Sequence, residues 1–479
     1  MTLADTVTAE PQERRPSLKV ASGLLGVATI FTRVSVLLVL ALLTRDAGAA
    51  SVGYYGLATL TASFVAAGLS LGVPMYLTRD VAAGAVSRAQ AARIHVGRLM
   101  VLAAATAVAY PIIGLTVPGE IVAGFFLFLV SSVLEQWNDT AWVLIRGTRK
   151  AWAEALTNGV AGIALVAVCA ADTWLFDGLT FTDAALYFVV IAALRSAAAV
   201  VASGLWRQLR TPAHVAWIAQ IRSALPYYAS DLLGLMYFRG SVFVLALFVS
   251  AAQVGEYVAA SALVNPAVQV AASMGVGALA YAGRLAGDGA SDEPGAIFRF
   301  FRGTGFAAAG GLLIGLPLAT FVLFGADAGH TPELTAILAL FLALRFANYG
   351  LSAILLSAGG AGSRLLVLVY SIVGNVVLNV LLAGPFGAYG AAWATVLTEL
   401  VVAASMLWFI RDRALVRLVV PATVVVGALG VVLVAFLSWS TTVAAVVTGV
   451  LFLALGGAGF LPRPQRGVHR APSIMKEYV

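Results

Sequence analysis

The sequence predicts an all-α, polytopic membrane protein with fourteen transmembrane helices, arranged as two six-helix lobes and two further helices. Three observations predict this: the composition, the distribution of basic residues between apolar segments, and an internal repeat. Of the 479 residues, 61% are hydrophobic and only 11% are charged, and the mean hydropathy is +0.96. Soluble domains are about 45–50% apolar and about 25% charged. A chain of this composition therefore lies in a bilayer.

Fourteen apolar stretches are long enough to cross the bilayer as helices, which takes about 20 residues each. The loops between them are too short to hold a folded domain. The expected spans, in chain order, are residues 18–44, 51–77, 94–117, 121–145, 155–176, 181–206, 223–249, 254–281, 300–325, 333–357, 365–384, 388–410, 418–437 and 441–461.

The basic residues test this count and set the orientation. With a cytoplasmic N-terminus, 24 of the 29 lysines and arginines fall in cytoplasmic tails and loops or at the span ends that border them, and only Arg45 falls on the external side. Positive residues concentrate on the cytoplasmic side of membrane proteins, so both termini are expected there. The net charge of +7 then reflects topology and calls for no nucleic-acid partner. The single cysteine, Cys169, excludes an intramolecular disulfide.

An internal repeat divides the chain. Three motifs recur six spans later and in the same order: RVSV (33–36) as RGSV (239–242), VGYY (52–55) as VGEY (254–257) and, more weakly, ExxN (135–138) as RxxN (345–348). An even offset gives both copies the same orientation, as in parallel repeats related by an axis along the membrane normal. Two such lobes enclose a cleft.

The repeat gives the expected domain boundaries. Residues 18–210 form an N-lobe with spans one to six, and residues 211–413 form a C-lobe with spans seven to twelve. The last two spans occupy residues 414–462. Residues 1–17 and the basic stretch 463–479 are polar and are predicted to be disordered cytoplasmic tails.

Several motifs identify a known group of transporters. They are TR (32–33) before an apolar run, VGYYGL (52–57), LSLGVP (69–74), and IVGNVVLN (372–379) followed by PFGAYGAAWATVLTE (385–399). The sequence thereby resembles the multidrug/oligosaccharidyl-lipid/polysaccharide (MOP) exporter superfamily, in particular its polysaccharide-transporter branch of Wzx-type flippases. The resemblance implies a two-lobed transporter that turns lipid-linked sugars across the membrane by alternating access.

Four arginines lie near the middle of predicted spans, and they are the strongest candidate site residues. A mid-bilayer arginine costs about 2.5–3.5 kcal/mol or more, and from this depth its side chain does not reach either interface. These arginines should therefore face a cleft between the lobes. A guanidinium forks onto phosphate oxygens, so we expect them to bind the phosphate of a lipid carrier, with the symmetric pair foremost. They are Arg33, Arg239, Arg345 and Arg195.

Four acids also fall inside spans. They either pair with the arginines or bind a coupling H⁺ or Na⁺; no other cofactor and no metal site is expected. Two asparagines are expected as polar cleft residues, Asn138 and Asn348. The acids are Asp231, Glu135, Asp139 and Glu399.

The function predicted from these features is a flippase, not an enzyme, in the cytoplasmic membrane. It would translocate a polyprenyl-phosphate- or diphosphate-linked oligosaccharide for cell-surface polysaccharide biosynthesis. We expect a monomer that contacts this substrate, membrane lipids and glycosyltransferases or a polymerase of the same pathway. Three alternatives stay open: a cation-coupled multidrug antiporter, which would favour an acidic cleft; a membrane-embedded glycosyltransferase or polymerase, which would favour larger external loops; and a scaffold that binds carrier lipid.

Overall fold

The computed structural model describes residues 18–460, apart from short segments at 70–71, 74–76, 78–79, 82–84, 117, 144–150, 177, 216, 289–292 and 359. Side chains are described from residue 30 onward. Some helical positions lack a described side chain, and these include Asp139 and Asp231. The predicted tails, 1–17 and 463–479, lie outside the described residues.

The described residues form helices and no strand. Ten of the helical stretches are long and apolar enough to cross a membrane, so the chain is a multi-pass membrane protein. In chain order the elements are α1 (Leu18–Gly68), α3 (Arg88–Thr116), α4 (Gly119–Val143), α5 (Ala151–Leu175), α6 (Phe181–Ser203), α7 (Leu205–Arg210), α8 (Trp217–Leu245), α9 (Ala251–Asp288), α10 (Glu293–Phe324), η1 (Gly325–Ala328), α11 (Thr331–Ser357), α12 (Ala361–Ile410), α13 (Arg413–Leu437) and α14 (Thr441–Phe460).

Two of these elements combine two predicted spans each. The 51-residue α1 is interrupted at Gly48, with φ 77°, and the 50-residue α12 at Gly387, with φ 58°. Glycine adopts positive φ without the steric cost that a Cβ imposes. Both breaks fall where the sequence separates consecutive spans. Neither α8 nor α14 is among the ten long apolar stretches, so the count of fourteen crossings and the orientation stay predictions.

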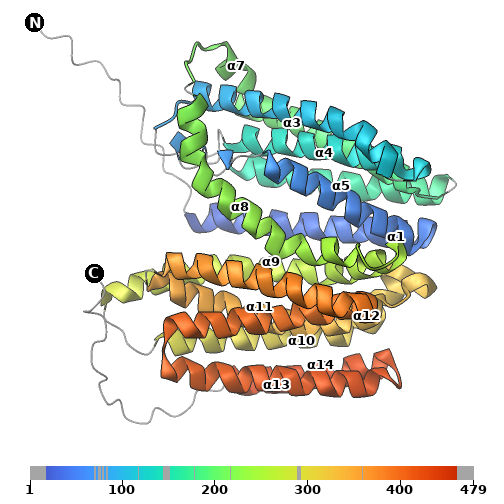
Figure 1. The fold of residues 1–479 in the computed structure, drawn as a ribbon, viewed down its shortest axis with the longest axis vertical. Coiled ribbons are helices and arrows are strands. Elements are labelled where there is room, and N and C mark those ends of the chain that lie inside the picture. Colours follow the sequence, from blue (N-terminus) through green and yellow to red (C-terminus); the bar gives the residue numbers. More distant parts are fainter. Residues whose placement is uncertain are drawn as a thin grey trace, which may run out of the picture.

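The helices lie side by side in two groups (Figure 1). One group holds α3, α4 and α5, the other holds α10 to α14, and α1, α8 and α9 run between them. The most extensive packing in the molecule joins α1 to α9, and α8 packs on α1 and α12. The boundary between the two groups is therefore built from the helices that begin each predicted repeat.

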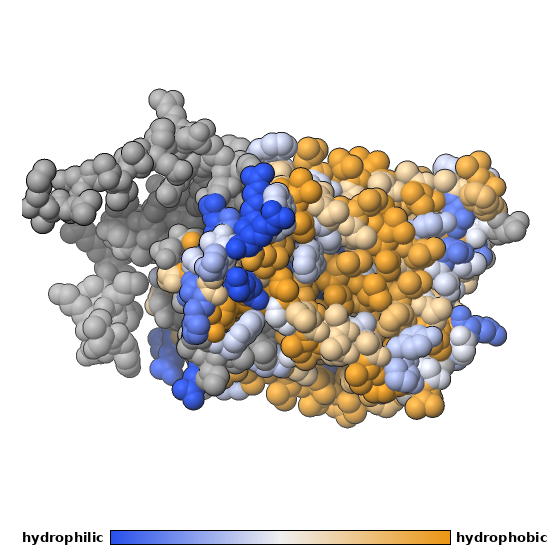
Figure 2. Space-filling view, turned by 90° about the horizontal axis from the view of Figure 1, so that it is seen from above, coloured by the Kyte–Doolittle hydropathy of each residue, from blue (hydrophilic) through white to orange (hydrophobic). Residues whose placement is uncertain are grey.

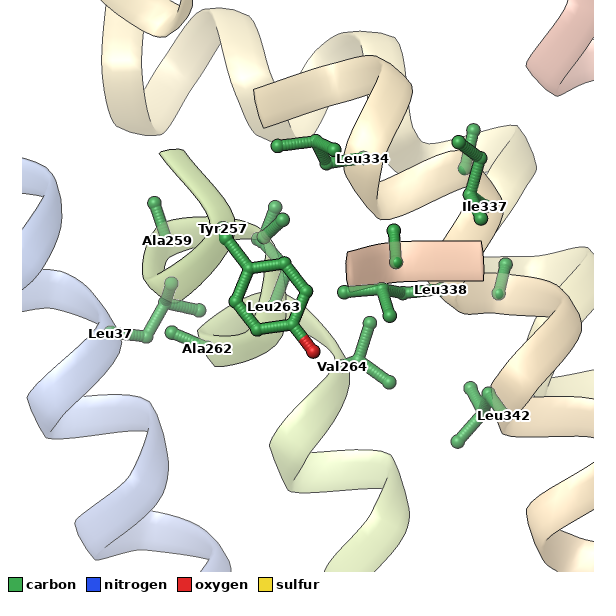
Figure 3. Packing of buried hydrophobic residues seen from close by; sticks show 14 of the residues in the cluster. Leu37, Tyr257, Ala259, Ala262, Leu263, Val264, Leu334, Ile337, Leu338 and Leu342 are labelled. Atoms are coloured by element: carbon green, nitrogen blue, oxygen red, sulfur yellow. The ribbon is translucent and has the colours of Figure 1, made fainter. Parts of the chain in front are cut away.

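The interior on the C-terminal side centres on α11, which packs against α9, α10, α12 and α13. Tyr257 shows how the layers meet: its ring lies between Leu37 of α1 and the leucines of α11, such as Leu334 and Leu338 (Figure 3).

Large apolar side chains on the outer faces stay exposed; Leu115 is 88% and Phe321 74% exposed. Hydrophobic surface covers the flank and hydrophilic side chains gather toward the ends (Figure 2), as expected for a helical bundle in lipid.

A reciprocal glycine contact brings α1 and α9 together. A Cβ built on Gly53 would overlap the carbonyl oxygen of Ala251, and a Cβ on Gly255 would overlap the carbonyl oxygen of Ala49. Both glycines belong to the repeated VGxY motif, so the two copies of the motif pack on each other. Nearby, the Arg45 guanidinium donates to the carbonyl of Val322. This end of the molecule, which the charge pattern predicts to be external, is thereby closed between the two halves.

Replacing Gly53 or Gly255 with alanine should destabilise this arrangement. The added methyl group meets a backbone carbonyl rather than a flexible side chain, so overpacking should cost about 1–3 kcal/mol or more. We expect a lower thermal unfolding temperature for the detergent-purified variants. The matched control is Gly311→Ala, where a Cβ meets nothing within 4 Å. Equal unfolding temperatures for all variants would contradict the close approach.

The predicted orientation is tested by thiol labelling. Replacing Cys169 with alanine removes the only cysteine, and single cysteines then go to the exposed positions Ser250 and Thr211. A membrane-impermeant maleimide applied to whole cells should label the cysteine at 250 and label the one at 211 only after lysis. The reverse pattern would invert the topology.

Candidate substrate site

Two cavities lie next to each other in the middle of the protein. The interlobe cavity, about 340 Å³, is lined by α1, α8, α9, α11 and α12. The N-lobe cavity, about 680 Å³, is lined by α1, α4, α5 and α6, with Leu235 of α8. Arg33 lines both cavities. It therefore sits where they meet.

Arg33 and Arg239 reach the interlobe cavity from opposite halves of the protein. Arg33 comes from α1, where Val36 and Leu40 line the cavity on the same helical face, and Arg239 comes from α8. Within the described part of the chain, neither guanidinium has a hydrogen-bond or ion-pair partner. Two positive charges thus border one cavity, and no described side chain neutralises either of them.

Arg345 and Glu399 form a buried ion pair in the wall of the interlobe cavity. Arg345 Nη1 lies 2.8 Å from Glu399 Oε1, and their side chains are 6% and 2% exposed. The Tyr237 hydroxyl accepts from Arg345 and donates to Glu399 Oε1 at 2.8 Å. The Tyr237 ring also lies 4.5 Å below the guanidinium. Arg345, predicted to bind phosphate, is therefore already neutralised by a carboxylate.

Arg195 and Glu135 form a second ion pair, in the wall of the N-lobe cavity. Arg195 Nη1 donates to Glu135 Oε1 at 2.6 Å, and Arg195 Nη2 donates to Asn158 Oδ1 at 2.7 Å. This pair is more open than the first, since the arginine and glutamate side chains are 15% and 38% exposed. Arg195 is thus ion-paired and lines the N-lobe cavity, not the interlobe cavity that was predicted for it.

The two ion pairs occupy equivalent positions in the repeat with reversed polarity. In the first copy the fourth span carries the acid and the sixth carries the arginine; in the second copy the tenth span carries the arginine and the twelfth carries the acid. Attraction between two charges does not depend on which helix carries which sign. Exchanging the acid and the arginine between the two helices therefore keeps the ion pair. This exchange is the reason why the ExxN motif of the first copy matches the RxxN motif of the second only weakly.

Two predicted cleft residues lie elsewhere. Asn138 is 1% exposed and accepts a hydrogen bond from Trp142 Nε1 at 2.9 Å. Asn348 donates to Glu399 Oε2 at 2.7 Å. Neither lines the two cavities, because each is turned toward a neighbouring side chain in the packed interior. The two asparagines therefore bond to neighbouring side chains, and their predicted role in a polar cleft stays a prediction.

Arg98 is a further buried arginine, which was included with the cytoplasmic charges because it stands near the start of the predicted span 94–117. It lies on α3, is 6% exposed and donates to Gln136 of α4 at 3.1 Å. The helix begins at residue 88, earlier than the hydropathy suggests. Asp139 and Asp231 lie outside the described side chains, so their predicted role stays a prediction.

Other cavity residues were missed as site residues. Tyr55 and Tyr257 line the interlobe cavity, and Ser131 and Asn158 line the N-lobe cavity. The two tyrosines stand in the repeated VGxY motif, which was a usable signal. Nothing distinguishes Ser131 or Asn158 in the sequence. Within the described residues, no group of three or more His, Cys, Asp or Glu side chains forms a metal-binding cluster.

This fold is shared with transporters of the MOP superfamily. The inward closed form of the lipid II flippase MurJ matches 91% of this chain and 98% of its own, with a TM-score of 0.65 and 13% identity. An inward-facing multidrug resistance MATE transporter of the MOP superfamily matches 80% of this chain and 93% of its own, with a TM-score of 0.62 and 15% identity. No protein-family model and no curated protein sequence matches the chain. At these identities the likeness establishes the fold.

Replacing an ion-paired arginine with a neutral residue should change protein stability differently from replacing Arg33 or Arg239. Arg345→Met leaves Glu399 buried and unpaired, which costs about 3–5 kcal/mol, and adding Glu399→Leu should recover much of it. Arg33→Met and Arg239→Met remove charges that have no partner among the described side chains, so stability should be unchanged or higher. Unfolding of the purified variants by heat or denaturant measures this. An equal loss for all three arginines would refute the distinction.

Proposed function

We propose that the protein is a flippase for sugars linked to a polyprenyl phosphate or diphosphate, acting in the cytoplasmic membrane. One observation carries the proposal: Arg33 and Arg239, from opposite halves of the protein, border one cavity and have no partner among the described residues. The Arg345–Glu399 pair adds no net charge, so among the described residues the cavity carries two positive charges without a counter-charge. Phosphate oxygens match the forked donors of a guanidinium.

The position of the two arginines supports transport rather than static binding. Without an anion, two like charges on opposite halves repel each other across the cavity. A phosphate bound between them reverses the sign of this interaction and draws α1 and α8 together. Occupancy of the cavity is thereby coupled to the spacing of the lobes, which is what alternating access requires.

The alternatives fit the cavities less well. Fold likeness to MATE transporters is compatible with a multidrug antiporter, but two unpaired arginines disfavour a cationic drug. A glycosyltransferase or polymerase on the same lipid carrier lacks a visible catalytic group in the cavities, where both described acids are ion-paired. Coupling to H⁺ or Na⁺, a monomeric state and partnership with enzymes of the same pathway stay part of the proposal.

Loss of either arginine should weaken binding of polyprenyl diphosphate to the purified protein. A hydrogen bond to a charged group contributes about 1.5–3 kcal/mol, so Arg33→Ala or Arg239→Ala should raise Kd roughly 10- to 150-fold. Arg→Lys should restore only part of the affinity, because the fork is lost. Higher salt should weaken wild-type binding more than variant binding.

The control for this experiment is Arg417→Ala, which removes an exposed arginine from α13 and should leave Kd unchanged. Transport of a lipid-linked sugar in proteoliposomes should fall with binding. Unchanged binding and transport in the Arg33→Ala/Arg239→Ala double variant would reject the phosphate site.

A further inference from the structure

We infer that the N-lobe cavity is the glycan subsite, and that it holds the first sugar units of the lipid-linked substrate while their phosphate lies on Arg33 and Arg239. This inference rests on the proposed function and adds a location and a chemistry for the sugar. Its starting point is Arg33, which lines both cavities. In a lipid-linked sugar the first ring is bonded directly to the phosphate, so a phosphate at Arg33 places that ring at the mouth of one cavity or the other.

The N-lobe cavity suits an uncharged polar ligand. Its volume of about 680 Å³ is within the range of about 300–1,000 Å³ typical of pockets for small molecules. Apart from Arg33, its charged lining consists of Glu135 and Arg195, which neutralise each other at 2.6 Å. The rest of the polar lining is serine, threonine, asparagine and glutamine. Neutral hydroxylated sugars match this lining, whereas a second anion does not.

Two groups in this cavity have unused hydrogen-bonding capacity. The Ser131 hydroxyl has no partner in the described part of the chain. Asn158 uses Oδ1 to accept from Arg195, and its Nδ2 has no partner there. Three more lining hydroxyls donate only to carbonyls of their own helix, which leaves their oxygens able to accept: Ser35, Thr59 and Ser63.

The opposite wall of the interlobe cavity differs in this respect. Where α12 borders this cavity, polar side chains bond to one another: Ser241 donates to Asn375 at 3.1 Å, and the hydroxyls of Tyr257 and Thr395 lie 2.9 Å apart. A sugar at that wall would have to replace bonds that the protein already makes. On the N-lobe side, Ser131 and Asn158 offer groups that have no partner among the described residues, and this favours the glycan there.

Aromatic rings complete the subsite. Phe128 and Phe188 both line the N-lobe cavity, and their centroids lie 5.5 Å apart. A ligand pocket combines apolar and aromatic walls with a few placed polar groups that fix orientation. The C–H face of a sugar ring packs on such walls while its hydroxyls reach Ser131 and Asn158. These two side chains are therefore assigned as specificity-determining residues.

The test compares lipids with and without a glycan. Binding of polyprenyl diphosphate is measured beside a panel of polyprenyl diphosphates carrying one to three neutral sugars and lipid-linked glycans extracted from the source cells. Wild type should bind at least one glycosylated lipid more tightly than the bare lipid. Ser131→Ala and Asn158→Ala should each reduce that gain about 3- to 10-fold, with bare-lipid affinity within about 2-fold of wild type.

Folding is kept separate from binding by the choice of variants. Ser131→Ala breaks no bond within the described protein, so its unfolding temperature should equal that of wild type. Ala161→Phe fills the same cavity and should exclude glycosylated lipids while bare polyprenyl diphosphate still binds. The matched control, Ser371→Ala, removes a buried hydroxyl that bonds to Val367 of its own helix and should change neither affinity.

The outcomes separate the two proposals. If bare polyprenyl diphosphate binds through Arg33 and Arg239 but no glycan raises the affinity, or if the N-lobe variants leave the gain intact, the glycan subsite is overturned and the phosphate site stands. If bare polyprenyl diphosphate does not bind, the proposed function fails, and the subsite fails with it.

Discussion

The structure depends on how a guanidinium is accommodated in the middle of a bilayer. A charge at that depth has to be paired or has to face a polar cavity, because lipid offers neither water nor hydrogen bonds. Both solutions occur here. Arg345 is buried against Glu399 and stacked on Tyr237. Arg33 and Arg239 face the interlobe cavity instead. The interlobe cavity therefore lies at the two arginines that have no partner among the described residues.

The repeat explains why the unpaired arginines face each other. Parallel copies related by an axis along the membrane normal place equivalent residues on opposite sides of that axis. Arg33 and Arg239 are equivalent in the repeat and line one cavity, and Gly53 and Gly255 are equivalent and lie where α1 and α9 touch. The two ion pairs each join helices of one half, Arg195 with Glu135 and Arg345 with Glu399. The acid and the arginine have exchanged places between the two halves.

Sequence predicted the class of fold and the symmetric part of the site. The class of fold depends on local signals, which each segment of the sequence carries by itself. These signals are the composition, the distribution of basic residues and the separations between spans, where the structure has breaks at Gly48 and Gly387. Arg33 and Arg239 were found because the repeat points to both. The partner of Arg195 or Arg345 was not predictable, since it depends on which helices become neighbours. The surroundings of Asn138 and Arg98 were not predicted, because hydropathy indicates how deep a residue lies in the membrane but not the direction in which its side chain points.

The N-lobe cavity was invisible to sequence for a related reason. A cavity is the volume that packed side chains leave over, and no single residue encodes it. Ser131 and Asn158 are isolated polar residues in apolar helices, and such residues most often bond between helices. Only the structure shows that Asn158 accepts a hydrogen bond from Arg195 through Oδ1 and also lines the cavity.

Two opposing interactions act between the halves of the protein, one between α1 and α9 and one between α1 and α8. The contact of Gly53 and Gly255 holds α1 against α9 at one end, and backbone contacts so close leave no intermediate spacing that keeps the packing intact. The charges of Arg33 and Arg239 push the same two halves apart in the middle. An anion removes the repulsion without touching the glycines. In the proposed mechanism, filling and emptying the interlobe cavity would therefore change the balance between the glycine contact and the repulsion of the two arginines.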